Sequence, residues 1–114
     1  VRRTKDGVLV LFHDKTLERV ACHSGSIADY TYEELLQIPI IHAATGKQAL
    51  IVKLDDFFEE FTKDGIWYAI ELKDPDIEKD VLNVVFSNFS VILLHLLIIH
   101  KVNIIFFKTN FISL

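Results

Sequence analysis

The sequence predicts an α/β fold in which parallel strands are covered by helices. Two short runs, residues 8–12 and 66–70, are rich in β-branched and aromatic side chains and are apolar at successive positions. Strands that are buried on both sides of a parallel sheet have this composition. Helical patterns lie between and after the two runs, and the order strand, helices, strand, helix is the one that a parallel α/β sheet produces.

Each predicted strand has a turn before it and ionisable residues after it. The same four residues, Thr-Lys-Asp-Gly, occupy positions 4–7 and 62–65. Asp-Gly favours a turn because glycine adopts positive φ without a steric cost. His13 follows the first strand and Glu71 follows the second. Since ligands bind at the carboxyl ends of the strands in α/β sheets and barrels, we expect His13 and Glu71 at the rim of one site.

Three helices are predicted. In the first, Thr31 and Glu34 have the capping-box spacing, and the next proline along the chain ends the helix. The second covers residues 54–61, where apolar side chains recur at i, i+3, i+4 and i+7 and acidic side chains occupy the other face. The third opens on the Asp-Pro pair at 74–75, an acidic cap with proline at the first helical position, and runs toward residue 85.

The composition of the chain changes near residue 80. All sixteen acidic residues lie before position 81, whereas the last 34 residues are mostly apolar and have Lys101 and Lys108 as their only formal charges. We therefore divide the chain into residues 1–85, a partial domain, and residues 86–114, an apolar tail of uncertain origin. A tail of this composition also fits a segment that does not belong to the native domain.

Residues 91–107, within this tail, are predicted to form a strand or a buried helix. They include His95, His100, Lys101 and Asn103. A lysine at the centre of a membrane helix costs about 2.5–3.5 kcal/mol, whereas each large apolar side chain returns about 0.3–0.6 kcal/mol. A membrane helix is therefore the less favoured alternative, although the sequence leaves it open.

Length and composition narrow the choice of function further. The chain has 114 residues without a methionine, so we expect a processed chain or a fragment, and it is too short for an eight-stranded α/β barrel of about 250 residues. Its net charge of −4 argues against a nucleic-acid partner. The single cysteine, Cys22, excludes an internal disulfide framework and is compatible with a reducing compartment.

His13 is the first candidate for chemistry. A histidine at a rim can move protons near neutral pH, and the adjacent Asp14 can fix which ring nitrogen carries the proton. The alternative is a histidine at the end of a strand whose polar atoms are satisfied by a turn.

Glu71 and Lys73 are the second candidate. They lie two positions apart on the predicted strand, so their side chains share a face. A carboxylate oxygen suits a hard metal ion, and an ammonium group neutralises phosphoryl charge. The alternative is an exposed ion pair worth under about 1 kcal/mol. For the remaining cysteine and histidine residues we favour structural roles, because none has a partner at a useful spacing: Cys22, His23, His42, His95 and His100.

These candidates lie within motifs that resemble the glycerophosphodiester phosphodiesterase family. Residues 4–19 match the family's "T-x-D-G-x-x-V-x-x-H-D-x-T-L-x-R" stretch, and residues 25–35 are similar to its glycine and "T-x-E-E-L" helix start. Residues 54–57 resemble the "L-x-E-x-L" helix, and residues 69–73 the "I-E-x-K" strand. The family has a TIM barrel, so the resemblance implies an incomplete (β/α)8 barrel fragment that covers the region of strands 2 and 3.

The resemblance implies a metal-dependent hydrolysis. Family members cleave a small-molecule glycerophosphodiester to sn-glycerol 3-phosphate and an alcohol, with Mg²⁺ or Ca²⁺. They use two histidines as acid and base, one of which matches His13, and Asp14 matches the aspartate that orients or supports it. Glu71 matches one metal ligand, and Lys73 matches a lysine near the phosphate.

Part of the family pattern is not found in this chain. The "E-x-D" metal motif is expected immediately before the position of Val1, and the first histidine further upstream. Residues 1–114 therefore hold one of two expected histidines and one of three expected carboxylate ligands, and we expect them to be inactive alone. Two alternatives stay open: a binding or regulatory module that uses the same scaffold without catalysis, and a membrane-attached piece that uses residues 91–107.

Overall fold

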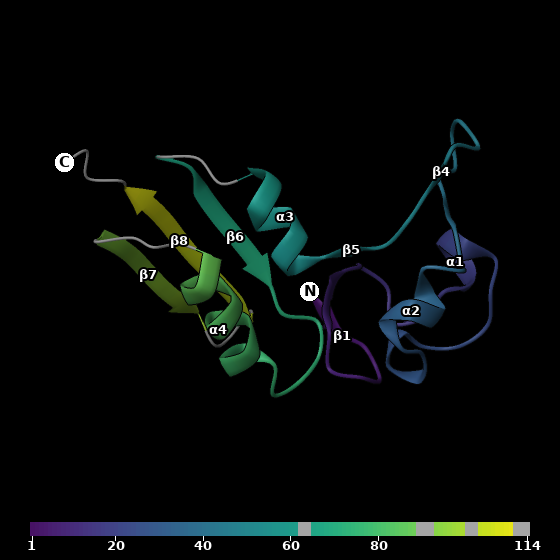
Figure 1. The fold of residues 1–114 in the computed structure, drawn as a ribbon, viewed down its shortest axis with the longest axis horizontal. Helices are drawn as coiled ribbons and strands as arrows, with labels where there is room; N and C mark the ends of the chain where they lie inside the picture. The colour runs from purple at the N-terminus through teal and green to yellow at the C-terminus, as the bar shows by residue number, and fades with distance from the viewer. Residues whose placement is uncertain (62–64, 89–92, 100–102, 111–114) are drawn as a thin grey trace. The chain divides into compact units, whose positions relative to one another are not determined.

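The computed structural model describes residues 1–61, 65–88, 93–99 and 103–110, and the chain falls into two units, Val1–Leu54 and Asp55–Leu114. Figure 1 shows both units and labels most of their helices and strands.

The first unit contains short strands, helical turns and one small core. Its elements are β1 (Arg2–Arg3), β2 (Leu9–Leu11), α1 (Glu18–Ala21), the 3-10 turn η1 (Ile27–Asp29), α2 (Tyr32–Leu35), β3 (Ile40–Ile41), β4 (Gln48–Ala49) and β5 (Val52–Lys53). The strands β1, β2 and β5 form one antiparallel sheet in that order, and β3 and β4 form a separate antiparallel hairpin.

The predicted Asp-Gly turn is confirmed, and it reverses the chain between β1 and β2. The φ of Gly7 is +83°, its amide donates to the Thr4 carbonyl at 3.1 Å, and the Thr4 amide donates to the Val8 carbonyl at 2.9 Å. The Asp6 carboxylate accepts from the Thr4 hydroxyl at 2.6 Å and from the Tyr32 amide at 3.0 Å, which ties the turn to α2.

The expectation of parallel strands is wrong for the part of the chain that the structure describes. Every strand pair among these residues is antiparallel. For β1 and β2 the reason is the turn at residues 4–8, because a connection this short can join only antiparallel neighbours, whereas parallel ones need a crossover of about a dozen residues or more.

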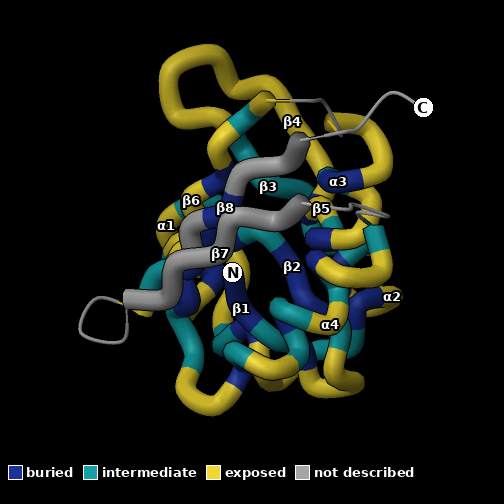
Figure 2. The backbone as a smooth tube through the Cα atoms, turned by 90° about the vertical axis from the view of Figure 1, so that its left-hand side faces the viewer, coloured by how far each residue is buried: buried dark blue, intermediate teal, exposed yellow. Residues whose placement is uncertain are grey.

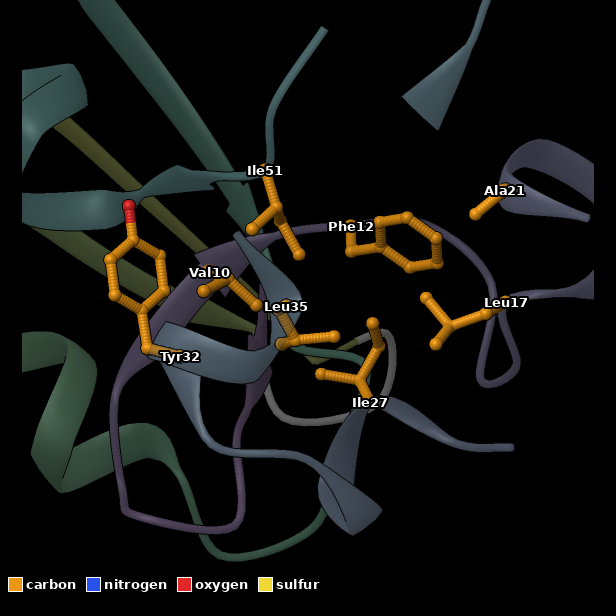
Figure 3. Close-up of a cluster of buried hydrophobic side chains, with 8 residues drawn as sticks. All are labelled: Val10, Phe12, Leu17, Ala21, Ile27, Tyr32, Leu35 and Ile51. Atoms are coloured by element: carbon orange, nitrogen blue, oxygen red, sulfur yellow. The ribbon is translucent and has the colours of Figure 1, made fainter. Parts of the chain in front are cut away.

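The core of the first unit gathers around β2. Eight buried side chains contribute to it (Figure 3): Val10, Phe12, Leu17, Ala21, Ile27, Tyr32, Leu35 and Ile51. The cluster draws on β2, both short helices and the 3-10 turn, so burial of these side chains holds helices of only four residues that would not be stable alone. Figure 2 shows β2 as buried, whereas the connection between β3 and β4 is exposed.

The capping box predicted for the first helix is confirmed at the start of α2. The Thr31 hydroxyl accepts from the Glu34 amide at 3.2 Å, and the Glu34 carboxylate accepts from the Thr31 amide at 2.8 Å. We expect Thr31→Ala to lower the free energy of unfolding by about 1 kcal/mol, because the Glu34 amide then loses its acceptor. Urea unfolding measures this, with Thr31→Ser as the control that keeps the hydroxyl. An equal loss in both variants would contradict the capping role.

The second unit combines a three-stranded sheet with two helices. Its elements are α3 (Leu54–Phe61), which begins at the last residue of the first unit, β6 (Trp67–Glu71), α4 (Glu78–Asn88), β7 (Leu93–Ile99) and β8 (Ile104–Asn110). The sheet has the order β6-β8-β7, with antiparallel pairs throughout (Figure 1).

The helix predicted over residues 54–61 is confirmed as α3, and its apolar face packs on this sheet. The Phe58 ring is fully buried, with its centroid 5.6 Å from that of Tyr68 in β6 and 5.7 Å from that of Phe107 in β8. The rings of Tyr68 and Phe107 stack at 4.8 Å. Three aromatic rings from three elements therefore form one contact at the centre of the unit.

Two details of the second unit differ from expectation. The strand predicted over residues 66–70 is present as β6, but it is buried on one face only: Tyr68 and Ile70 are buried and the alternate residues are exposed. An antiparallel sheet with one covered face gives this alternation. In addition, α4 begins at Glu78 instead of at the Asp-Pro pair, because the φ of Asp76 is +58° and a left-handed residue cannot lie inside the helix.

Of the two structures predicted for residues 91–107, a strand or a buried helix, the described parts form strands, β7 and the first half of β8. His100 and Lys101 lie outside the described residues. Across the described ranges, none of the helices combines the length and the apolar character that a membrane span requires. The domain boundary between residues 85 and 86 stays a prediction.

Candidate functional site

His13 lies two residues after β2, and its side chain is 75% exposed. Its Nδ1 atom is 2.7 Å from Oδ1 of Asp14. Asp14 in turn accepts two hydrogen bonds from Arg19 of α1, from Nε to Oδ2 at 2.6 Å and from an Nη atom to Oδ1 at 2.9 Å. The His13 ring is thus exposed to a ligand, while its Nδ1 edge is held by a carboxylate.

The charges around Asp14 determine which ring nitrogen of His13 donates. The hydrogen bonds from Arg19, and then that from His13, hold the pKa of the Asp14 carboxyl well below its usual range. Near neutral pH the carboxylate has no proton of its own, so the hydrogen in the 2.7 Å contact belongs to Nδ1 of His13. The other nitrogen, Nε2, is then left to accept a proton when the imidazole is neutral.

The main chain of His13 is held from the other side by Arg2. The Nε and Nη2 atoms of Arg2 donate to the His13 carbonyl at 3.2 and 2.8 Å. Arg2 is in β1 and is only 8% exposed. Because β1 pairs with β2, the strand that leads into His13, this contact joins two ends of the same hairpin.

Glu71 and Lys73 meet as the sequence predicts. The Lys73 Nζ atom lies 2.7 Å from Oε1 of Glu71 at the end of β6. The Glu71 side chain is 51% exposed and that of Lys73 is 23% exposed. The Glu71 carboxylate is therefore the more accessible member of the pair, whereas most of the Lys73 side chain is covered.

The described residues do not make a complete metal site. Within the described ranges, no three His, Cys, Asp or Glu side chains come together in a way that could hold a metal ion. Glu71 offers one carboxylate, and that carboxylate contacts Lys73. We therefore derive no reaction step through a metal from this structure.

The two pairs of candidate residues belong to different units. His13 and Asp14 lie in the first unit, and Glu71 and Lys73 in the second. The prediction that His13 and Glu71 share one rim stays a prediction. The parallel sheet from which we inferred it is not what the described strands form.

Arg2 and Arg19 are the contacts that the sequence reasoning missed. Arg19 is the last residue of the motif at 4–19, so its place six residues after His13 was visible, but no role followed from that spacing. The contact of Arg2 is with a main-chain carbonyl, and no residue type marks such a partner in a sequence.

The structural roles that we favour for the other cysteine and histidine residues stay a prediction, and the side chains of His95 and His100 lie outside the described residues. Cys22 is exposed and is not in a disulfide, the His42 Nδ1 atom lies 3.2 Å from the Thr45 hydroxyl, and the His23 ring packs edge-on against Tyr30.

The second unit has a cavity of about 660 Å³ directly after β6. Its lining comes from Leu72, residues 74–79, Leu82 and Asn103. Three of these residues are acidic and one is a lysine: Asp74, Asp76, Glu78 and Lys79. This excess of negative charge disfavours a phosphate, so we do not assign the phosphate of a substrate to this cavity.

Comparisons with known proteins agree with one another. A family model described as the glycerophosphoryl diester phosphodiesterase family matches residues 1–111. A protein of Bacillus altitudinis named glycerophosphodiester phosphodiesterase is 37% identical over 90 residues, which cover 71% of this chain and 36% of that protein. The matched region therefore spans about a third of the relative's length.

Proposed function

Because the chain belongs to the glycerophosphoryl diester phosphodiesterase family, we propose that it forms part of an enzyme that hydrolyses glycerophosphodiesters to glycerol 3-phosphate and an alcohol. The observation that carries this proposal is the exposed His13, whose Nδ1 atom is held by the ionised Asp14. A histidine fixed in this way presents Nε2 for proton transfer, which the hydrolysis of a phosphodiester needs at both oxygens that change partners.

In the proposed reaction His13 is one of two acid–base groups. A water oxygen forms a bond to phosphorus, the bond from phosphorus to the alcohol oxygen breaks, and a proton passes from the water to the departing alkoxide. His13 accepts or supplies that proton at Nε2, according to the side of the phosphorus on which it lies. Asp14 keeps its charge throughout and stabilises the imidazolium when it forms.

Glu71 and Lys73 are proposed to act on the charged parts of the site. Glu71 would supply one oxygen ligand to a divalent cation, Mg²⁺ or Ca²⁺, and Lys73 would neutralise the phosphate. Their contact supports this proposal, because it brings a carboxylate and an ammonium group to within 2.7 Å of each other at the end of a strand. The family pattern places two further carboxylates before the position of Val1, and a cation needs several pre-placed ligands to bind tightly.

We also propose that residues 1–85 form a partial glycerophosphodiester phosphodiesterase domain and that residues 86–114 are an apolar tail. In the proposed enzyme these residues belong to a (β/α)8 barrel. The family membership supports that fold.

Hydrolysis of glycerophosphocholine tests the proposal. The assay compares residues 1–114 with an extended protein, defined as this chain together with the preceding sequence in which the family pattern places the first histidine and the "E-x-D" motif. We expect the extended protein to release glycerol 3-phosphate with added Mg²⁺ or Ca²⁺ and to stop when EDTA removes the cation. We expect residues 1–114 to release none.

Two results would contradict the proposal. Activity of residues 1–114 alone would show that the upstream motifs are not needed. Binding of glycerophosphocholine to the extended protein without hydrolysis would favour the non-catalytic binding module.

A further inference from the structure

We propose that Arg19 is a positioning residue that acts through Asp14 to hold the His13 ring with Nδ1 as the donor and Nε2 open to a ligand. Its consequence for catalysis rests on the proposed function, whereas the orientation of the ring can be measured without it.

The contact between Arg19 and Asp14 consists of two hydrogen bonds. Arg19 binds both carboxylate oxygens of Asp14, at 2.6 and 2.9 Å. Two hydrogen bonds from one planar guanidinium fix the plane of the carboxylate as well as its position. Because Oδ1 also contacts Nδ1 of His13 at 2.7 Å, the plane set by Arg19 is the plane that directs the acceptor at the ring. A lysine, with a compact ammonium group, cannot impose this orientation.

The helix α1, which carries Arg19, is itself held in place. Leu17 immediately precedes the helix and is 2% exposed, and Ala21 ends it and is 8% exposed. Both side chains belong to the core cluster around β2 (Figure 3). Arg19 projects from a helix that is fixed to the core on both sides of it, so its guanidinium starts from a rigid base.

The main chain of His13 is held as well. Arg2 holds the His13 carbonyl with two donors, at 3.2 and 2.8 Å, from a side chain that is almost fully buried. The backbone of His13 is therefore attached to β1 while its ring is attached, through Asp14, to α1. With both attachments in place, a ligand meets a histidine whose ring orientation is already set.

Three charged side chains contact His13 or its partner: Asp14 at the ring, Arg19 at Asp14, and Arg2 at the His13 carbonyl. The charges of Arg19 and Asp14 offset each other. The position of the proton on the His13 ring is therefore set mainly by the hydrogen bond to Asp14, and less by the net charge nearby. Without Arg19 the Asp14 carboxylate can rotate toward water, and the ring nitrogen loses a fixed acceptor.

Nitrogen-15 NMR of the His13 ring tests the proposal in residues 1–114. At a pH where imidazoles are neutral, correlations between ring protons and ring nitrogens distinguish the Nδ1–H form from the Nε2–H form. We expect the Nδ1–H form of His13 to dominate in the wild type and to lose its dominance in Arg19→Gln. Lys15→Gln is the matched control, because it removes the same charge from an exposed residue shortly before α1 and leaves the contacts of Asp14 with His13 and Arg19 intact.

Kinetics of the extended protein give the second readout. We expect Arg19→Gln to lower kcat by up to about 100-fold with KM unchanged, since a misplaced catalytic group slows the chemical step. Arg19→Lys keeps the charge but not the paired hydrogen bonds, so it should recover only part of the loss.

The outcomes separate the two proposals. An unchanged Nδ1–H population in Arg19→Gln, or an equal change in Lys15→Gln, would overturn the positioning role. A changed population with unchanged kcat would leave the positioning role standing and would overturn the acid–base role of His13. If Arg19→Gln does not fold, Arg19→Lys decides: a reduced Nδ1–H population supports the role of the paired contact, and a full population overturns it.

Discussion

Replacing His13 by asparagine in the extended protein lowers kcat for glycerophosphodiester hydrolysis by about 10²- to 10⁴-fold, the contribution of a positioned acid or base. Asparagine can still donate a hydrogen bond to Asp14 from its side-chain amide, but it cannot carry the proton. The loss should therefore appear in kcat at every pH at which the wild type is active. Steady-state kinetics with glycerophosphocholine measure it.

His42→Asn is the matched control for this variant. His42 is exposed in the same unit, and its Nδ1 atom contacts the Thr45 hydroxyl instead of a carboxylate. We expect its kcat to stay within about 2-fold of the wild type, because substitutions of exposed residues that lie outside a buried or catalytic cluster have small effects. A His13→Asn enzyme as active as His42→Asn would remove His13 from the mechanism.

The second large effect is on stability. Phe58→Ala lowers the free energy of unfolding by about 3–5 kcal/mol, the usual loss for a fully buried aromatic ring. The Phe58 ring is 0% exposed and touches the rings of Tyr68 and Phe107, so its removal leaves a cavity between α3, β6 and β8. Because the free energy of unfolding of a whole domain is only about 5–15 kcal/mol, this one substitution removes a large part of it. Urea unfolding followed by circular dichroism measures it.

Phe61→Ala is the matched control for this prediction. Phe61 lies one turn further along α3 and is 46% exposed. It contacts Phe57 at a centroid distance of 5.1 Å. The hydrogen bond from the Tyr68 hydroxyl goes to its main-chain carbonyl, which alanine keeps. We expect a loss of about 1 kcal/mol or less. Equal losses in the two variants would show that the ring cluster is not the centre of the unit.

The elements that depend on neighbouring residues could be predicted from the sequence. The Asp-Gly turn before β2, the capping box of α2 and the amphipathic helix α3 each follow from residues within one or two turns of each other. The start of α4 could not be predicted in the same way. Proline at position 75 suits a first helical position, but the left-handed Asp76 delays the helix to Glu78.

The direction of strand pairing was the main error, and its cause is physical. An apolar run of five residues shows that a strand is buried, but not which strand lies beside it or in which direction. In the described residues β6 pairs with β8, more than thirty positions further along the chain. That partner comes from the apolar tail, for which the sequence left a strand and a buried helix open and indicated no sheet.

The candidate site shows the same division. His13 and Asp14 are adjacent in sequence, and Glu71 and Lys73 are two apart, so both pairs could be found by spacing. Arg2 contacts His13 across eleven positions, and it does so at a carbonyl. A contact of that kind depends on how β1 and β2 pair, which no motif encodes.

Trp67 gives the second unit an optical reporter of its own. It is the only tryptophan of the chain, it begins β6, and it is 60% exposed on the face of the strand opposite to Tyr68 and Ile70. Its indole emission and its quenching by acrylamide therefore respond to water at that face. In residues 1–114 the same fluorophore can follow whether a ligand or a second protein covers this face, without any label or substitution.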